Sequence, residues 1–224
     1  MDTHLNADFT VPVTIDTNAM AWVPSPSPGV DRRMLDRIGD EVAVATSIVR
    51  YAPGGSFSPH RHDLGEEFLV LSGVFSDEHG DYPAGTYVRN PPGSTHAPHT
   101  AGGCVIFVKL RQMAATDSAH VVLRSDGAVS EPVDDRGAQR TLLHACPQAR
   151  EVVAIESLPP GYAGPLEVCE HGEEILVLDG ELRDDAGVYG PGFWIRRPAG
   201  MSRRLSSGPG ARYWVKRGRI AQPL

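Results

Sequence analysis

Apolar residues recur along this chain in short runs, and glycine and proline separate the runs from one another. In the first half, strand-like runs cover residues 41–51, 68–71, 86–89 and 105–110. In the second half they cover residues 152–155, 175–180, 193–196 and 213–216. No segment of helical period is longer than about ten residues. Short strands with regular turns predict an all-β protein, folded as a sandwich or a barrel.

One spacing of motif residues occurs twice. The first copy is marked by Gly54, His60, His62, Glu66, Gly73, Pro91 and His96, and the second by Gly161, Glu167, Cys169, Glu173, Gly180, Pro198 and Arg203. The residue numbers of all matching positions differ by the same amount, the repeat offset, which separates His60 from Glu167 and His96 from Arg203. A duplicated domain of about 100 residues is of ordinary size. We therefore predict an N-terminal arm at 1–19, a barrel at 20–111, a connection at 112–137 with a strand at 121–123, and a second barrel at 138–224.

Composition narrows the class of protein. The 24 glycines and 19 prolines suit a turn-rich β fold, and the net charge of −7 argues against a nucleic-acid partner. The N-terminal residues do not resemble a secretion signal, and no apolar stretch is long enough for a membrane span. Three distant cysteines do not suggest a disulfide framework. We expect a cytoplasmic protein.

The first copy carries a set of metal ligands. His60 and His62 lie two residues apart, so on a strand their side chains share one face. Glu66 follows after a tight segment, and His96 follows a rigid Pro-Pro-Gly corner. Three imidazoles and one carboxylate suit Zn²⁺, which is our first choice, or Fe²⁺, Mn²⁺ or Ni²⁺. One divalent ion with one carboxylate leaves a positive site, which favours a small anionic or enolisable ligand.

These motifs resemble those of the cupin superfamily, which consists of small jelly-roll barrels that hold a metal inside. The resemblance covers residues 22–111 well and 138–217 more loosely, and it implies the ligand set His60, His62, Glu66 and His96. Thr100 departs from the cupin pattern, which has Asn there. The segments 62–71 and 75–96 are similar to ChrR-like cupins. That family includes a zinc-binding anti-sigma domain and non-haem dioxygenases that cleave diketones or hydroxyketones.

The second copy lacks a complete ligand set. Arg203 replaces the last histidine, and arginine stays protonated and does not ligate metals. We predict that Arg203 forms a cluster with Glu167 and Glu173 in place of an ion. A second alternative is a metal held by Cys169, His171 and Glu173. The first alternative predicts one metal ion per chain.

Two functions are compatible with these residues. The function that we predict is a metal-dependent sensor or regulatory module for oxidative or small-molecule signals. The alternative is a non-haem metal-dependent dioxygenase that cleaves small diketones or hydroxyketones, and the residues do not assign a catalytic group. The chain has no cysteine before Cys104, so we do not expect the sigma-binding zinc module of the anti-sigma protein. We expect a homodimer, because cupin barrels often pair through their outer strands.

Overall fold

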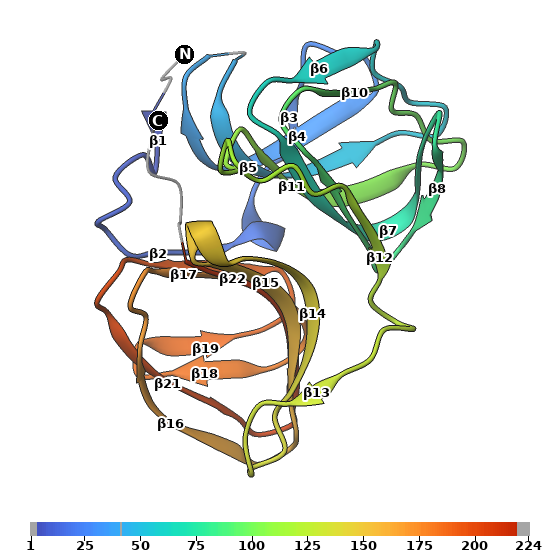
Figure 1. Ribbon diagram of the computed structural model, residues 1–224. Coiled ribbons are helices and arrows are strands. Elements are labelled where there is room, and N and C mark those ends of the chain that lie inside the picture. The colour runs from blue at the N-terminus through green and yellow to red at the C-terminus, as the bar shows by residue number, and fades with distance from the viewer. Residues whose placement is uncertain (1–3, 41, 219–224) are drawn as a thin grey trace. The chain divides into compact units, whose positions relative to one another are not determined.

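The structure is a computed structural model that describes residues 4–40 and 42–218. Its contacts divide the chain into two units. The first contains residues up to Ala7 and Met20–Asp126, and the second contains Asp8–Ala19 and the residues from Gly127 onward. Both are built almost entirely of antiparallel strands, so the predicted all-β class is confirmed (Figure 1). Among the described residues, no helix has the length and apolar character required to cross a membrane.

The first unit has one large sheet and one small sheet. The large sheet has the strand order β1-β4-β5-β11-β7-β9-β12, with β3 beside β4 and β8 beside β7, and the small sheet pairs β6 with β10. The strand bounds are β1 His4–Leu5, β3 Val23–Pro24, β4 Val30–Ile38, β5 Val44–Tyr51, β6 His60–His62, β7 Glu66–Asp77, β8 Gly80–Pro83, β9 Thr86–Asn90, β10 Ser94–His96, β11 Cys104–Leu110 and β12 Val121–Arg124.

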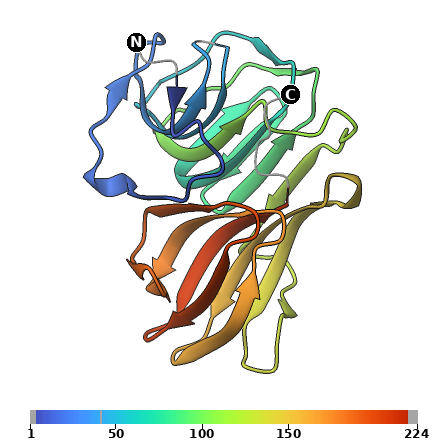
Figure 2. The same ribbon diagram turned by 90° about the vertical axis from the view of Figure 1, so that its left-hand side faces the viewer.

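The second unit repeats this plan, as two views of its ribbon show (Figures 1 and 2). Its sheets have the orders β13-β14-β15-β22-β17-β20-β2 and β16-β21-β18-β19. The element bounds are β2 Val13–Asp16, η1 Thr17–Ala19, β13 Glu131–Pro132, β14 Gln139–Cys146, η2 Pro147–Ala149, β15 Glu151–Leu158, β16 Tyr162–Val168, β17 Glu173–Gly180, β18 Leu182–Asp184, β19 Gly187–Tyr189, β20 Phe193–Arg197, β21 Ser202–Ser207 and β22 Ala211–Arg217.

The repeat seen in the sequence is also present in the strands. β5 and β15, β9 and β20, and β11 and β22 form three pairs, and in each pair both ends are separated by the repeat offset. The two sets of strands bury separate apolar cores. Phe68, Val70, Phe75 and Ile106 belong to the first core, and Ile175, Val177, Leu182 and Tyr213 belong to the second.

The strands at one edge of the two large sheets are exchanged between the repeats. β2 lies before the first barrel in the sequence, yet it pairs with β20 of the second unit. β12 lies after the first barrel and pairs with β9 of the first unit. In these pairings Val13 lies opposite Arg196, and Val121 lies opposite Arg89, which is the repeat counterpart of Arg196. Each repeat therefore begins with a strand that completes the sheet of the other repeat.

One segment differs from what its local sequence predicts. The segment from Asp77 to Pro83 contains two aspartates, a glycine and a proline, and these residues predict a turn from end to end. In the structure β7 continues to Asp77, and Gly80–Pro83 forms β8, which pairs back onto β7. Burial of Tyr82 in the first core explains the difference, because tertiary packing outweighs a weak local propensity. This hairpin places Asp77 beside the predicted metal ligands.

Candidate metal centre

The four predicted ligands come from three strands of the first unit. β6 supplies His60 and His62, β7 begins at Glu66, and β10 ends at His96. β6 pairs with β10 so that His60 lies directly opposite His96. Two glycines fix the corners: the Gly65 amide donates to the His62 carbonyl at 3.3 Å, and the Gly93 amide donates to the same carbonyl at 2.7 Å. Both glycines have positive φ, which favours glycine at these turns.

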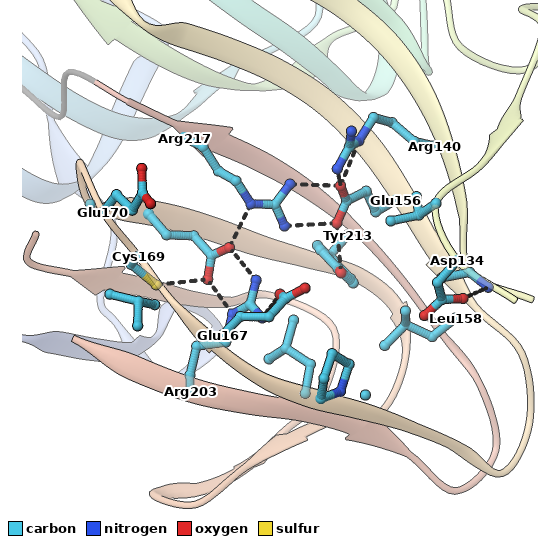
Figure 3. A pocket seen from close by; sticks show the side chains of 18 of the residues that line it. Asp134, Arg140, Glu156, Leu158, Glu167, Cys169, Glu170, Arg203, Tyr213 and Arg217 are labelled. Carbon is cyan, nitrogen blue, oxygen red and sulfur yellow. Dashed lines mark hydrogen bonds and ion pairs between the residues drawn. The ribbon is translucent and has the colours of Figure 1, made fainter. Parts of the chain in front are cut away.

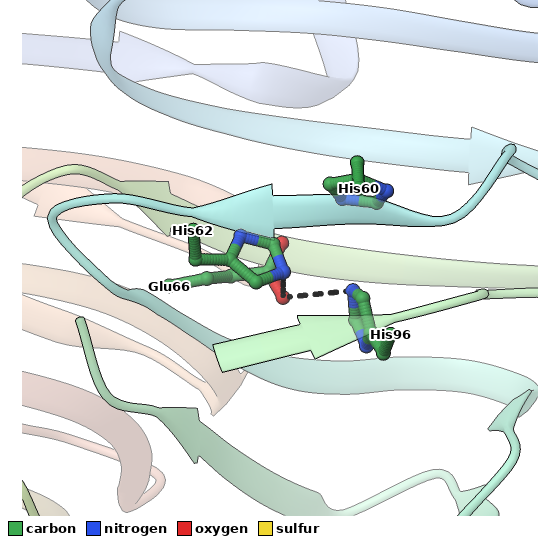
Figure 4. Close-up of side chains that lie close together, drawn as sticks. All are labelled: His60, His62, Glu66 and His96. Atoms are coloured by element: carbon green, nitrogen blue, oxygen red, sulfur yellow. Dashed lines mark ion pairs between the residues drawn. The ribbon is translucent and has the colours of Figure 1, made fainter. Parts of the chain in front are cut away.

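The side chains of these four residues converge on one point (Figure 4). One ligand atom from each of the four can be chosen so that all lie within 4.8 Å of one another. The Nε2 atoms of His62 and His96 each lie 3.5 Å from Oε2 of Glu66. This separation is too long for a good hydrogen bond. It is close to the ~3.4 Å expected between two ligands that share one ion at ~2.1 Å in tetrahedral geometry.

Two ring nitrogens at this point lack a hydrogen-bond partner. Nε2 of His62 and Nε2 of His96 are buried and make no hydrogen bond to any described residue. In His96 and His60 the other ring nitrogen, Nδ1, has a partner. Nδ1 of His96 lies 3.2 Å from Oδ2 of Asp77, and Nδ1 of His60 lies 2.9 Å from the Ser58 carbonyl. In these two rings Nε2 is therefore the nitrogen that is left to bind a metal. Buried polar atoms normally have a partner, and a divalent cation fits this donor set.

The electrostatic environment also suits metal ligation. Burial, and then the neighbouring His60, lower the pKa of His62 to about 4, so that His62 is neutral near pH 7. Burial raises the pKa of Glu66, while His96 and a hydrogen bond from Asn90 Nδ2 at 3.2 Å oppose this effect. A neutral imidazole is the form that binds a metal, and a cation beside Glu66 would stabilise its buried carboxylate.

Asp77 is a residue of the candidate site that the sequence analysis does not identify. It is buried, and besides contacting His96 it accepts hydrogen bonds from Tyr82 Oη at 2.9 Å and from the His79 amide at 2.8 Å. A carboxylate on the far nitrogen of a ligating histidine fixes the orientation of its ring. The repeat contained the signal for this residue, because Asp184 accepts the matching hydrogen bonds from Tyr189 Oη and the Ala186 amide at 2.8 Å each.

A pocket of about 390 Å³ opens onto the four residues. Its walls are largely apolar and come from β4, β5, β7 and β11. They include Val30, Val49, Tyr51, Phe75, Ile106 and Val108, and Arg32, Arg61 and Arg111 also line the pocket. A cavity of this size beside the ligands can hold a small organic molecule.

In the second unit, an arginine occupies the position of the last histidine (Figure 3). Arg203 Nε and Nη2 donate to Glu173 at 3.0 and 2.9 Å, and Nη1 donates to Glu167. The predicted cluster of Arg203 with the two glutamates is therefore confirmed. Arg197 and Arg217 also donate to Glu173, at 3.1 and 2.9 Å. Burial alone would raise the pKa of Glu173, but its three arginine neighbours lower it to about 2.

The alternative metal site in the second unit is not formed. Cys169 Sγ lies 3.9 Å from Oε1 of Glu173, and burial raises the pKa of this thiol to about 11. The ring of His171 instead contacts Arg150, with His171 Nε2 3.2 Å from Arg150 Nη1. Cys169, His171 and Glu173 do not come together as a metal-ligand group among the described residues.

Two tandem jelly-roll barrels, one with a convergent histidine and glutamate cluster, define a bicupin. The model of the ChrR cupin-like domain family matches the chain twice, over residues 10–114 and 118–221. The chain belongs to this family, and the predicted resemblance is confirmed. No curated protein shows a significant match to the sequence.

Solved structures with the same fold include several bicupins. A candidate dioxygenase from Nostoc punctiforme superimposes with a TM-score of 0.78 at 14% identity, over 96% of this chain and 85% of that one. A candidate glyoxylate-induced protein from Pseudomonas aeruginosa gives 0.76 at 17% identity, over 95% and 91%. Oxalate decarboxylase from Bacillus subtilis, studied for its Mn(II) centres, gives 0.60 at 12% identity, over 94% and 78%. At these identities the likeness shows the fold.

Proposed function

We propose that the first barrel binds one divalent metal ion through His60, His62, Glu66 and His96, and that the chain is a non-haem metal-dependent dioxygenase for a small diketone or hydroxyketone. One observation carries the proposal. Two buried imidazole nitrogens without partners face a glutamate, beside a pocket of about 390 Å³. A metal centre that opens onto a pocket has room for a substrate, whereas a closed structural site does not.

The residues of the chain have distinct roles in this proposal. Burial holds His62 neutral, and Asp77 orients the His96 ring so that its Nε2 faces the centre. Glu66 supplies the single negative charge. The largely apolar walls lower the local dielectric constant, which strengthens electrostatic interactions in the pocket. When bound, a metal such as Fe²⁺ supplies Lewis acidity and reactivity toward O₂. The Nostoc protein, described as a candidate dioxygenase, is consistent with this activity.

The sensor function that the sequence also predicts uses the same metal centre. It would require a signal to alter the ligand shell. The open, mostly apolar pocket favours binding of a small molecule, and we therefore rank the enzyme first. Regulation of a partner protein stays a prediction.

The test begins with elemental analysis of the full chain purified without chelator or nickel resin. We expect one metal ion per chain, and oxygen uptake by the Fe²⁺-loaded protein with diketones or hydroxyketones. His96→Ala should abolish both. Cys169→Ala, at the second-barrel position that matches His62, is the control and should change neither. Bound zinc without oxygen uptake in any metal form would overturn the dioxygenase and favour the sensor.

A further inference from the structure

Arg32 lies on the wall of the pocket that opens onto the candidate metal centre. Val30 and Arg32 lie two residues apart on β4, and both side chains line this pocket. The neighbouring strand β5 presents Val49 and Tyr51 to the same pocket, and Arg32 lies opposite Val49 in the strand register. Arg32 therefore places a guanidinium on an otherwise apolar wall.

The Arg32 guanidinium has no acidic partner among the described residues. Its Nε atom is buried without a hydrogen-bond acceptor. The two other arginines of the pocket differ, because both contact Asp63: Arg61 Nε at 3.5 Å and Arg111 Nη1 at 3.4 Å. The side chain is half-buried and lines the pocket, so a carboxylate on a bound ligand can supply an acidic partner.

The second barrel shows the arrangement that Arg32 lacks. Arg140 lies opposite Glu156 in the register of β14 and β15, and Arg32 lies opposite Val49, which is the repeat counterpart of Glu156. Arg140 is thus the counterpart of Arg32. Arg140 Nε donates to Glu156 Oε1 at 2.8 Å, so the second barrel supplies a carboxylate to its arginine. The first barrel has a valine in that place and leaves its arginine open to the pocket.

We propose that Arg32 binds the carboxylate of the substrate, so that the pocket accepts small enolisable keto acids in preference to neutral diketones. The inference rests on the proposed function, because it requires the other end of the ligand to reach the metal centre. In the first barrel, the carboxylate of the ligand takes the place that Glu156 fills in the second. Arginine suits this role, since its planar fork matches carboxylate geometry.

The experiment compares two ligands that differ by one group. Acetylpyruvate is acetylacetone with one methyl group replaced by a carboxylate. Binding of each to the full chain loaded with Zn²⁺ is measured by titration calorimetry. We expect the wild type to bind acetylpyruvate at least about tenfold more tightly than acetylacetone, since a hydrogen bond to a charged group contributes about this much. Arg32→Met should abolish this preference and leave the affinity for acetylacetone unchanged.

Two further variants isolate the guanidinium. Arg33→Met is the matched control, because Arg33 neighbours Arg32 but stacks on Trp22 with its Cζ 4.1 Å from the ring centre, and it does not line the pocket. It should keep the full preference. Arg32→Lys keeps the charge without the fork and should retain part of it. Metal content and the affinity for acetylacetone report whether each variant is folded.

The outcomes separate this inference from the proposed function. A preference for acetylpyruvate that survives Arg32→Met would overturn the role of Arg32 and leave the metal-dependent function standing. An equal loss of affinity for both ligands in Arg32→Met would do the same, since it indicates a structural role. A wild type that binds neither ligand would overturn both.

Discussion

Arg203 binds both carboxylate oxygens of Glu173 in the second barrel, at the two positions that His96 and Glu66 occupy in the first. One barrel therefore holds its inner glutamate with arginines, and the other leaves its glutamate among histidines that have unpartnered nitrogens. A guanidinium can neutralise a carboxylate but has no lone pair to offer a metal ion. This difference, together with Glu167 and Cys169 at the positions of His60 and His62, explains why two barrels of one fold are expected to have different roles.

His62→Ala should remove the metal and destabilise the first barrel. His62 contributes one of the two buried nitrogens that have no other partner. Binding of a metal to the folded state adds to its stability, so the loss should appear in both metal content and melting temperature. Cys169→Ala alters the equivalent position of the second barrel and should leave one metal ion per chain. A full complement of metal in His62→Ala would contradict the proposed ligand set.

Asp77→Asn should weaken metal binding about tenfold without changing the ligand set. The aspartate carboxylate fixes the His96 ring through Nδ1 at 3.2 Å, and an amide is a weaker acceptor. Affinity can be measured by competition with a chelator of known strength. Asp184→Asn changes the counterpart residue in the second barrel and is the control. Equal metal affinity in the wild type and Asp77→Asn would show that Asp77 has no part in orienting His96.

Arg203→Ala should leave the metal content unchanged and destabilise the second barrel by about 3 kcal/mol, since removing one partner of a buried ion pair leaves the other charge uncompensated. The measurement is denaturant unfolding followed by fluorescence of Trp194 and Trp214, which are both fully buried in the second barrel. Arg204→Ala, at the exposed neighbouring position, should have little effect. Loss of metal from Arg203→Ala would refute the separate roles of the two barrels.

The second barrel should lose stability in acid. The pKa of Glu173 is about 2 in the folded chain against an ordinary value of 4.5, and that of Glu156 is also about 2. For both groups burial opposes the shift, and their arginine neighbours outweigh burial. A depressed folded pKa means that the stabilisation is fully present above pH 4.5 and declines as the pH falls toward about 2.

Unfolding midpoints followed by tryptophan fluorescence between neutral and acidic pH measure this decline. The stability of Glu156→Gln should fall less steeply as the pH is lowered, because one of the two titrating carboxylates is absent. Stability that is independent of pH down to about 3 would contradict the shifts, since both carboxylates would then titrate alike in the folded and unfolded states.

Gly73→Ala should destabilise the first barrel by more than Gly54→Ala. Both glycines have positive φ, 72° and 75°. A Cβ at Gly73 would collide with the Gly103 carbonyl, whereas a Cβ at Gly54 meets no atom within 4 Å. Gly54→Ala therefore measures only the free-energy cost of a positive φ in a residue with a side chain, about 1 kcal/mol. Equal melting temperatures in the two variants would mean that the backbone at Gly103 can move aside.

Much of the fold was predictable because the repeat doubles every signal. The predicted strands at 86–89 and 105–110 match β9 and β11 to within one residue at each end. The convergence of His60, His62, Glu66 and His96 was predicted from their spacing together with the cupin resemblance. The pairing of Arg203 with Glu173 was predicted from the repeat. A strand period and a rigid corner suffice to place such residues.

Other features depend on pairing between distant segments. The connection from β4 to β5 is longer than the connection from β14 to β15. For this reason Arg32 and Arg140, which occupy matching places in the sheets, are not separated by the repeat offset, and the sequence repeat does not align them. β2 ends at Asp16 and pairs with a strand that begins only at Phe193, and a local pattern of apolar residues contains no information about such a distant partner. Asp77 was assigned to a turn by its local composition.

The exchange of β2 and β12 separates the segment that is repeated in the sequence from the segment that folds. A fragment ending near residue 114 would carry β2 without the sheet that it completes, and its own β9 would expose an unpaired edge. A fragment of residues 10–114 and a fragment of residues 118–221, made separately, should each expose an unpaired strand edge and be prone to aggregate through it. Mixed together, each should supply the strand that the other lacks. For this chain, a domain boundary drawn by homology and one drawn by structure therefore fall in different places.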